Sequence, residues 1–271
     1  MENMFYKTYP IDANTWRIED IFGDYMYLIK GQSQAALIDT GMGFRGLDDV
    51  VRSLTDKPVI VLNTHGHVDH VGANGAFENV YIHPADEALL RQHGGSAYRQ
   101  ECLPEFMEEI GARIPASVIE DLVHVSQPET LSYLSDGQII DLGGRCLEVI
   151  SVPGHTRGSV CFLDAANRML FSGDMLCTMG IMLNFDCSTT VSAFLDSMEK
   201  LKAHVSCCVD AVYGGHHVAP ITIDYIDKYM ECGHRLLKSS AGAVAEQGVF
   251  GQFWRYFYED ISLTYTEATL K

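Results

Sequence analysis

A dense group of metal-ligand side chains lies between Asn63 and His70. The run reads Asn-Thr-His-Gly-His-Val-Asp-His, so three histidines and one aspartate fall within six positions. Neutral imidazole and carboxylate groups are the ligands that suit zinc, iron and related divalent ions. A polar loop that happens to be rich in histidine is the alternative, and it is disfavoured because four ligand-type side chains stand so close together. The run therefore predicts a metal centre.

Four further residues of the same types stand in short loops that contain or border glycine. They are Asp39, His155, Asp174 and His216. An apolar run precedes each of them, and glycine lets the backbone turn tightly at such places. Each has another explanation when taken singly, because an aspartate at a strand end often caps a turn and a lone histidine is usually structural. Together with the first group they supply enough ligands for two metal ions.

Short apolar strands and helices must position these residues. Val59–Leu62 is too short for a helix and rich in β-branched residues, which predicts a buried strand that ends at the metal group. Residues 25–31 and 34–41 predict a hairpin, and residues 45–55 have helical spacing. Strand ends are where α/β folds place reactive groups. Further strands are predicted at residues 80–83, 138–142, 146–152, 159–163, 169–171 and 211–213, and an amphipathic helix at residues 190–204.

Two segments differ in pattern from this alternation. Residues 84–127 contain short helical patterns at 85–93, 104–110 and 115–125, with Pro84 at the first position of a helix, which predicts a helical insertion. The insertion is either a lid over the site or a packed appendage. From Pro220 the pattern is helical to residue 245, and six aromatic residues follow within residues 250–258. This predicts a helical C-terminal extension whose aromatics seal a dimer interface, line a pocket mouth or pack in the core.

The order of these elements predicts a layered α/β sandwich in a single domain over residues 1–271. Composition limits its partners. Asp and Glu (36) exceed Lys and Arg (19), giving a formal net charge of -17, and such a surface repels nucleic acid. No stretch approaches the roughly 20 apolar residues of a membrane span, and Met1–Pro10 lacks a signal-peptide core. The eight cysteines form no CxxC pair, so we expect reduced thiols in a cytoplasmic protein.

Taken in order, the ligand-type residues resemble the five motifs of the metallo-β-lactamase superfamily. The resemblance covers residues 23 to 217 and rests on Asp39, the His65-x-His67-x-Asp69-His70 element, His155, Asp174 and His216. It implies an αββα sandwich with the metal site at one edge of two sheets. It further implies three ligands for a first ion (His65, His67, His155), three for a second (Asp69, His70, His216), and Asp174 as the bridge. Asp39 would orient ligands from beneath.

Departures from the motifs of individual branches limit which branch of the superfamily the chain resembles. The segments THGHVDH and PGHT resemble glyoxalase II, but its Gly-Cys-Gly-Arg segment is missing, which disfavours a glutathione thioester. Acyl-homoserine lactonases place a tyrosine three residues after the bridging aspartate, where this chain has Cys177. β-Lactamases of this fold commonly lack the equivalent of His70. His217 is the alternative to His216 as last ligand, and His216 is preferred because Gly215-His216 keeps the family's Gly-His order.

The predicted function is hydrolysis of a small ester, thioester or lactone by a metal-bridging hydroxide. Two ions, zinc with iron and manganese as alternatives, would lie roughly 3.5–4 Å apart and lower the pKa of water to about 7. Asp69 would accept the nucleophile's proton and pass it to the leaving group. The apolar run Met175–Leu183 is either an acyl-binding wall or ordinary core. A mono- or di-iron redox enzyme of the persulfide dioxygenase type and a non-catalytic binding protein are the alternatives.

Overall fold

A computed structural model describes residues 4–109, 127–128, 130–248 and 251–271. Its chain divides into two compact units, each with its own apolar core. Unit 1 comprises Met1–Leu134 and Ile140–Cys146, and unit 2 comprises Ser135–Ile139 and Leu147–Lys271. The single domain expected over residues 1–271 stays a prediction.

Unit 1 is built on a seven-stranded sheet whose strands follow one another in chain order, β1 to β7. The first four strands pair antiparallel, and β4, β5, β6 and β7 pair parallel. The predicted hairpin is the β3–β4 pair, and the predicted strand at Val59–Leu62 is β5. The strands are β1 (Tyr6–Asp12), β2 (Thr15–Asp20), β3 (Tyr25–Lys30), β4 (Ala35–Ile38), β5 (Val59–Leu62), β6 (Val80–Ile82) and β7 (Ser132–Tyr133).

Helices cover this sheet where apolar side chains recur at helical spacing. In α1 (Leu47–Leu54), Leu47, Val50 and Val51 are buried while charged residues face outward. They join a core with the aromatic stack of Phe44 on Phe5, whose ring centroids lie 5.1 Å apart. The remaining helical elements of unit 1 are α2 (Val68–Val71), η1 (Asn74–Ala76), η2 (Pro84–Asp86), α3 (Glu87–His93) and α4 (Ser96–Glu109).

The insertion is helical in its described part, and one of its helices differs from the prediction. Helix α4 begins at Ser96 and carries Pro104 in its interior, whereas the sequence pattern started a new helix at Pro104. Pro usually breaks a helix, and here the helix continues through it. The predicted helix at residues 115–125 lies outside the described residues, as do residues 110–126 as a whole.

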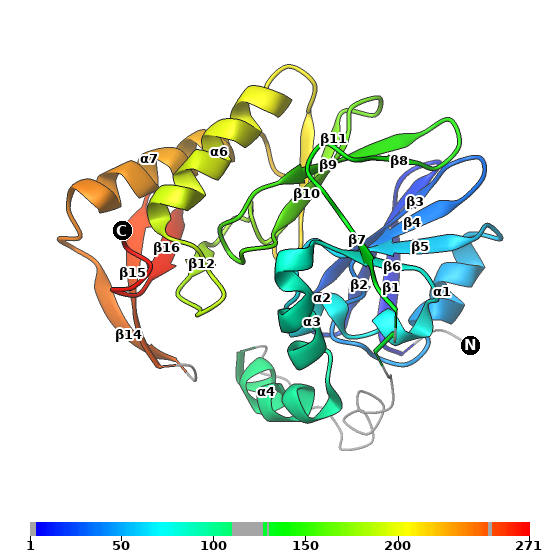
Figure 1. Cartoon of the computed structure of the whole chain (residues 1–271), viewed down its shortest axis with the longest axis horizontal. Helices are drawn as coiled ribbons and strands as arrows, with labels where there is room; N and C mark the ends of the chain where they lie inside the picture. Colours follow the sequence, from blue (N-terminus) through cyan, green and yellow to red (C-terminus); the bar gives the residue numbers. More distant parts are fainter. Residues whose placement is uncertain (1–3, 110–126, 129, 249–250) are drawn as a thin grey trace. The chain divides into compact units, whose positions relative to one another are not determined.

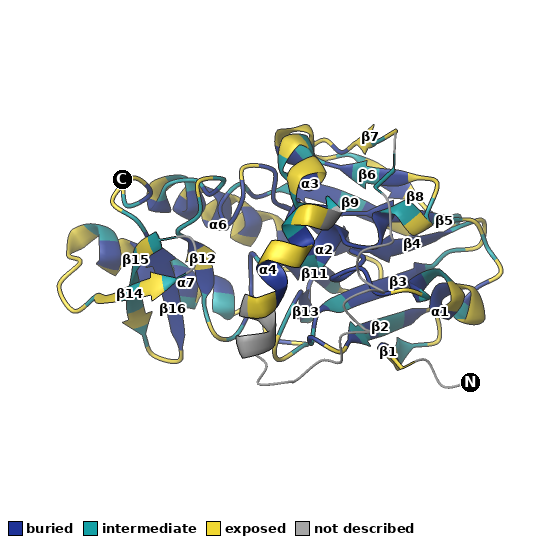
Figure 2. Ribbon diagram, turned by 90° about the horizontal axis from the view of Figure 1, so that it is seen from below, coloured by how far each residue is buried: buried dark blue, intermediate teal, exposed yellow. Residues whose placement is uncertain are grey.

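Unit 2 contains strands β13, β11, β10 and β9, in this order, of a five-stranded sheet whose fifth strand, β8, has only its first residue in this unit. Every residue of β10 is buried, and in β11 (labelled in Figure 2) all but Met169 are buried, because both runs are almost entirely apolar. The amphipathic helix predicted at residues 190–204 is α6 (Val191–Val205), which the Thr190 hydroxyl caps by accepting from Ala193 N–H. The strands are β8 (Ile139–Asp141), β9 (Cys146–Ser151), β10 (Val160–Asp164), β11 (Met169–Gly173) and β13 (Ala211–Gly214).

The C-terminal extension is only partly helical, which corrects the prediction. Helix α7 (Tyr225–Lys238) runs beside α6, but it stops well short of residue 245 (Figure 1). The aromatic segment is a strand, because Trp254, Tyr256 and Tyr258 alternate along it toward the core of unit 2. It belongs to a four-stranded sheet of order β12-β16-β15-β14. These strands are β12 (Ile181–Leu183), β14 (Val244–Gly248), β15 (Gly251–Tyr258) and β16 (Ile261–Tyr265).

Among the described residues, no helix combines the length and apolar character needed to cross a membrane.

Candidate metal centre

In unit 1 the predicted ligands follow the carboxyl ends of two parallel strands. Asp39 comes directly after β4, and His65 lies three residues after β5, its parallel neighbour. Parallel strands end at the same edge of a sheet, so both loops leave that edge together. The Asp39 N–H donates to Leu62 O at 3.2 Å, which fixes the two loops side by side.

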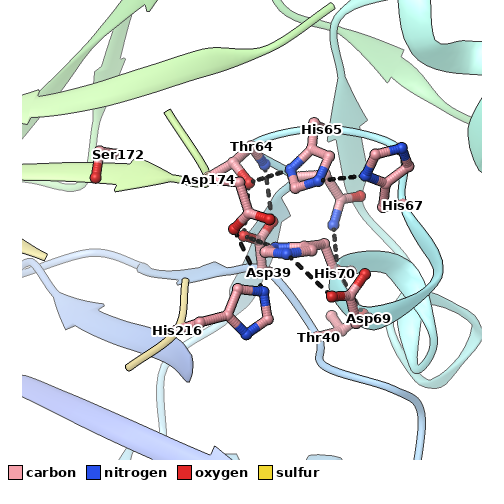
Figure 3. Close-up of polar contacts among 12 residues, drawn as sticks. Asp39, Thr40, Thr64, His65, His67, Asp69, His70, Ser172, Asp174 and His216 are labelled. Carbon is pink, nitrogen blue, oxygen red and sulfur yellow. Dashed lines mark hydrogen bonds and ion pairs between the residues drawn. The ribbon is translucent and has the colours of Figure 1, made fainter. Parts of the chain in front are cut away.

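The four ligand-type side chains of the first group form two pairs. His65 Nε2 lies 3.1 Å from His67 Nδ1, so these two ring nitrogens face the same point (Figure 3). His70 Nε2 lies 3.7 Å from Asp69 Oδ2. The His65 and His70 rings are 4.0 Å apart between centroids, which makes the pairs neighbours. The division of these ligands between two ions stays a prediction.

Asp39 underlies both pairs through Thr64 and His70. Its Oδ2 lies 2.8 Å from His70 Nδ1 and accepts from the Thr64 hydroxyl at 2.7 Å (Figure 3). Its Oδ1 accepts from Thr64 N–H at 2.7 Å. A carboxylate can only accept, so His70 Nδ1 carries the proton and Nε2 keeps its lone pair. Asp39 has a φ of 59°, an uncommon value for a non-glycine residue, and these bonds hold it there.

A buried polar network holds the backbone of His70. Its carbonyl oxygen accepts from Thr40 N–H at 2.8 Å, from the Thr40 hydroxyl at 3.2 Å and from Asn63 Nδ2 at 3.1 Å. Asn74 closes the network by accepting from Thr40 and donating to Asn63 Oδ1. Helix α2 is a single turn, too short to be stable alone, so this network fixes its orientation. The ligand spacing gave no signal for Thr40, Asn63 or Asn74.

The helical insertion packs against the loop that carries these ligands. Asp86 Oδ2 accepts from Gly66 N–H at 3.0 Å, between the two histidines. The buried Arg99 guanidinium donates to Gly72 O at 3.1 Å, and Gln127 Nε2 donates to Val71 O at 3.1 Å. The described part of the insertion is thus a support beneath the loop, and a lid stays a prediction for residues 84–127.

His93, at the end of α3, is a residue that the sequence reading missed. Its ring stacks on His67 with centroids 5.3 Å apart and on Tyr98 with centroids 4.0 Å apart. Burial lowers the pKa of His93 to about 4, against a smaller raising effect of the Asp69 charge. The neutral ring therefore limits how His67 can turn. A histidine at the end of a surface helix carries no pattern that points to this role.

In unit 2 the Asp174 carboxylate has one imidazole at each oxygen. Oδ2 lies 3.4 Å from His155 Nε2, and Oδ1 lies 3.3 Å from His216 Nε2 (Figure 3). These residues follow strands β9, β11 and β13, which are neighbours through β10 in one sheet. Strand β13 ends at Gly214, where an added Cβ would lie 2.7 Å from Leu176 O, so glycine is needed for this approach. His217 is exposed, with a φ of 63°, and His216 is the one that reaches Asp174.

His155 is fixed from its other side by Met182. Its Nδ1 lies 2.7 Å from Met182 O, and the Phe185 ring meets it edge-on at 5.7 Å between centroids. A carbonyl oxygen can only accept, so Nδ1 carries the proton and Nε2, on the side of Asp174, is the unprotonated nitrogen.

Most of the apolar run Met175–Leu183 is core. Met175, Leu176, Cys177, Ile181 and Leu183 are buried in the main cluster of unit 2. Burial, and then the Asp174 charge, raise the pKa of the Cys177 thiol to about 11, so Cys177 is a neutral thiol that donates to Gly180 O. Met179 and Met182 are the exceptions, with 64% and 37% of their surface exposed. The acyl-wall interpretation is therefore restricted to these two methionines.

The donor types of these clusters fit divalent metal ions. Imidazole nitrogens and carboxylate oxygens are the facing groups, and the hydrogen bonds of His70 and His155 leave Nε2 of each ring as the unprotonated nitrogen. Such donors suit zinc, iron and manganese alike. The described chain thus carries His and Asp side chains that could hold metal ions.

Comparison with known proteins supports the family that the sequence motifs resemble. Over 190 residues the chain is 32% identical to a human protein named acyl-coenzyme A thioesterase MBLAC2, a match that covers 65% of this chain and 66% of that protein, just under two thirds of its length. A metallo-beta-lactamase from Pontibacter korlensis has the same fold, with a TM-score of 0.60, 16% identity, and coverage of 84% of this chain and 99% of that one. The protein TTHA1623, solved in a di-iron-bound form, has a TM-score of 0.56 at 23% identity and covers 83% of this chain and 98% of that one.

The family-wide comparison covers every predicted ligand. The match to the Metallo-beta-lactamase superfamily runs over residues 22–216, from before Asp39 to His216. The chain therefore belongs to the metallo-beta-lactamase superfamily.

Proposed function

We propose that the protein is a metal-dependent hydrolase of acyl thioesters. The observation that carries the proposal is the Asp174 carboxylate with His155 at one oxygen and His216 at the other. A carboxylate that has an imidazole beside each oxygen could contribute to two neighbouring metal ions, with the imidazoles as further ligands. The arrangement supports Asp174 as the bridging ligand of a two-metal site.

The proposed ligand sets combine both units on the pattern of the family. The facing nitrogens of His65 and His67 support one ion, with His155 as its third histidine. The facing His70 and Asp69 support the second ion, with His216 completing it. Asp39 and Met182 set the tautomers of His70 and His155, which leaves an unprotonated Nε2 for each ion.

When bound, two such ions supply a water of lowered pKa and positive charge for the oxyanion that develops on the acyl carbon. The protein's own contribution is to place groups and to move a proton. Asp69 is half-buried, so it has access both to the ligand cluster and to incoming substrate. Its carboxylate accepts the proton of the attacking water and returns it to the leaving thiolate.

A thioester is the proposed substrate because the curated relatives named acyl-coenzyme A thioesterase match the chain over the region that carries the ligands. Esters and lactones need the same attack on a carbonyl carbon and differ in the leaving group. The exposed side chains of Met179 and Met182, the latter adjoining His155 through its backbone, support an apolar acyl group.

Metal analysis and a substrate panel test the proposal together. The purified protein should hold about two ions per chain and hydrolyse acyl-coenzyme A thioesters faster than simple esters or lactones. Asp69→Ala and His67→Ala should each abolish turnover while far-UV circular dichroism stays unchanged. His204→Ala is the matched control, because His204 is exposed, pairs with Glu148 and is not one of the proposed ligands.

Three outcomes would redirect the assignment. Full turnover in Asp69→Ala or His67→Ala would overturn the proposal. One iron per chain with oxygen uptake would favour the redox alternative. If the protein binds no metal and hydrolyses no substrate of the panel, a non-catalytic binding role is favoured.

A further inference from the structure

The acceptor that orients His155 belongs to a strand held by the C-terminal extension. Met182, whose carbonyl oxygen lies 2.7 Å from His155 Nδ1, is the middle residue of β12. Strand β12 stands at the edge of its sheet and pairs in parallel with β16, where Met182 is opposite Thr264. Strand β16 lies beyond residue 216, where the superfamily match ends.

We propose that the C-terminal sheet is a positioning device for the metal ligand His155. The pairing of β12 with β16 fixes the Met182 carbonyl, that carbonyl fixes the protonated Nδ1, and Nε2 is then directed to the ion. The inference rests on the proposed function, because it takes His155 as a ligand. The proposal gives the region after residue 216, which lies outside the family match, a role in orienting the ligand His155.

Side chains of the extension hold the rest of the segment between Asp174 and Met182. The Tyr229 hydroxyl of α7 donates to Cys177 O at 2.7 Å, and the Ser262 hydroxyl of β16 donates to Met179 O at 3.1 Å. Thr264 is hydrogen-bonded to the Asn184 amide oxygen just after β12. Tyr229, Ser262 and Thr264 are all buried, so water cannot readily replace these bonds. The segment is therefore docked on the extension at several successive residues.

Gly180 makes this close docking sterically feasible. A Cβ at this position would lie 2.4 Å from the Ser262 hydroxyl oxygen and 3.1 Å from Ser262 O. The first distance is shorter than any real contact, so an alanine here displaces either the Ser262 hydroxyl, which holds Met179 O, or the backbone of β12 relative to β16. Removing the Ser262 hydroxyl removes the tighter of the two clashes.

The experiment compares metal binding by the full-length Gly180→Ala variant and the wild type. Chelator competition with Co²⁺ measures the affinity of each ion, and the cobalt absorption spectrum reports its ligands. We expect Gly180→Ala to weaken the ion that His155 ligates by about 10- to 100-fold, the usual loss when a partner that orients a metal ligand is displaced. The double variant Gly180→Ala/Ser262→Ala should recover part of that loss.

A control and a milder variant separate positioning from general destabilisation. In Gly242→Ala the added Cβ meets no atom within 4 Å, although Gly242 has a φ of 93°, so this variant strains the same extension without touching β12. It should keep both cobalt affinities. Tyr229→Phe removes only the hydroxyl that holds Cys177 O and should weaken the same ion by a smaller factor, which keeps the test valid if Gly180→Ala does not fold.

The failures of the two proposals are distinguishable. A wild-type protein that binds no more than one cobalt ion would overturn the two-metal assignment. A wild type with two ions, together with unchanged affinities and spectra in Tyr229→Phe and in any folded Gly180→Ala, would overturn the positioning role alone. Equal losses of cobalt affinity in Gly242→Ala and Gly180→Ala would also overturn it. The loss would then follow from general destabilisation of the extension and not from a displaced Met182 carbonyl.

Discussion

Asp39 and His70 share a hydrogen bond of 2.8 Å between Oδ2 and Nδ1, deep in unit 1. In Asp39→Asn the amide can donate to Nδ1, which moves the ring proton to Nε2 and blocks that nitrogen as a ligand. We expect the second ion to bind about 10- to 100-fold more weakly, while the first ion is retained. Metal analysis after dialysis at low free zinc measures this, with the exposed Asp49→Asn as control. Two tightly held ions in Asp39→Asn would contradict the role of Asp39.

Removing metal should lower stability as well as activity. His65, His67 and His70 are buried with facing nitrogens, and an ion that binds only the folded chain stabilises it in proportion to its occupancy. At a free metal concentration of 100 times Kd this amounts to about 2.7 kcal/mol. A chelator should therefore lower the midpoint of thermal unfolding, and zinc, manganese or iron added back should restore it. A midpoint that does not respond to chelator would argue against occupied sites.

The exposed methionines give a prediction about acyl-chain length. Met182 contributes its carbonyl to His155, and its side chain is free to contact substrate. Met182→Ala keeps the carbonyl and removes apolar surface, so kcat/KM for a long-chain acyl thioester should fall by about 5- to 30-fold, equivalent to about 1–2 kcal/mol of lost burial. The value for an acetyl thioester should hardly change.

Met4→Ala is the matched control for this measurement, since Met4 is equally apolar and 72% exposed in unit 1. Equal losses for long and short chains in Met182→Ala would indicate that the substitution disturbs His155 instead of the acyl site.

The sequence pattern points to the predicted ligands directly and gives no sign of the residues that hold them in place. His65, His67, Asp69 and His70 are recognisable because a short motif brings them together, and Val59–Leu62 was read correctly because its apolar run is local. Met182 acts through its backbone carbonyl, which any residue could supply. Asn74 acts through its side-chain amide, but its position in the sequence has no characteristic spacing from the ligands. No local pattern reports such contacts.

Strands β12, β14 and β15 were missed because pairing with another strand, and not a local pattern of apolar residues, defines them. Strand β12 has only three residues and pairs with Leu263–Tyr265, about eighty positions further along the chain. The segment at Val244–Tyr258 was read as the end of a helix and an aromatic tail, although its hairpin pairing makes it two strands. Tertiary pairing overrode weak local preference in both cases.

A buried carboxyl outside the ligand set predicts how stability depends on pH. Burial raises the pKa of Asp20 well above its usual value, the Asp24 charge raises it further, and amide donors led by Met42 N–H oppose the rise. A raised pKa means that the folded chain holds this proton more tightly than the unfolded chain. The stability that Asp20 contributes is then complete below the ordinary carboxyl pKa and is lost as pH rises through the raised folded value.

Asp20→Asn cannot ionise, so it isolates this contribution. The free energy of unfolding of the wild type minus that of Asp20→Asn should decrease as the pH rises from the ordinary carboxyl pKa, about 4, through the neutral range. Urea unfolding in the presence of a chelator measures the free energy of unfolding of both proteins. Because both carry the same predicted metal ligands, the effect of protonating those ligands cancels in the difference. A difference that stays constant over this range would mean that Asp20 has the same pKa in the folded and unfolded chains. An increase with pH would mean that the amide donors outweigh burial and the charge of Asp24.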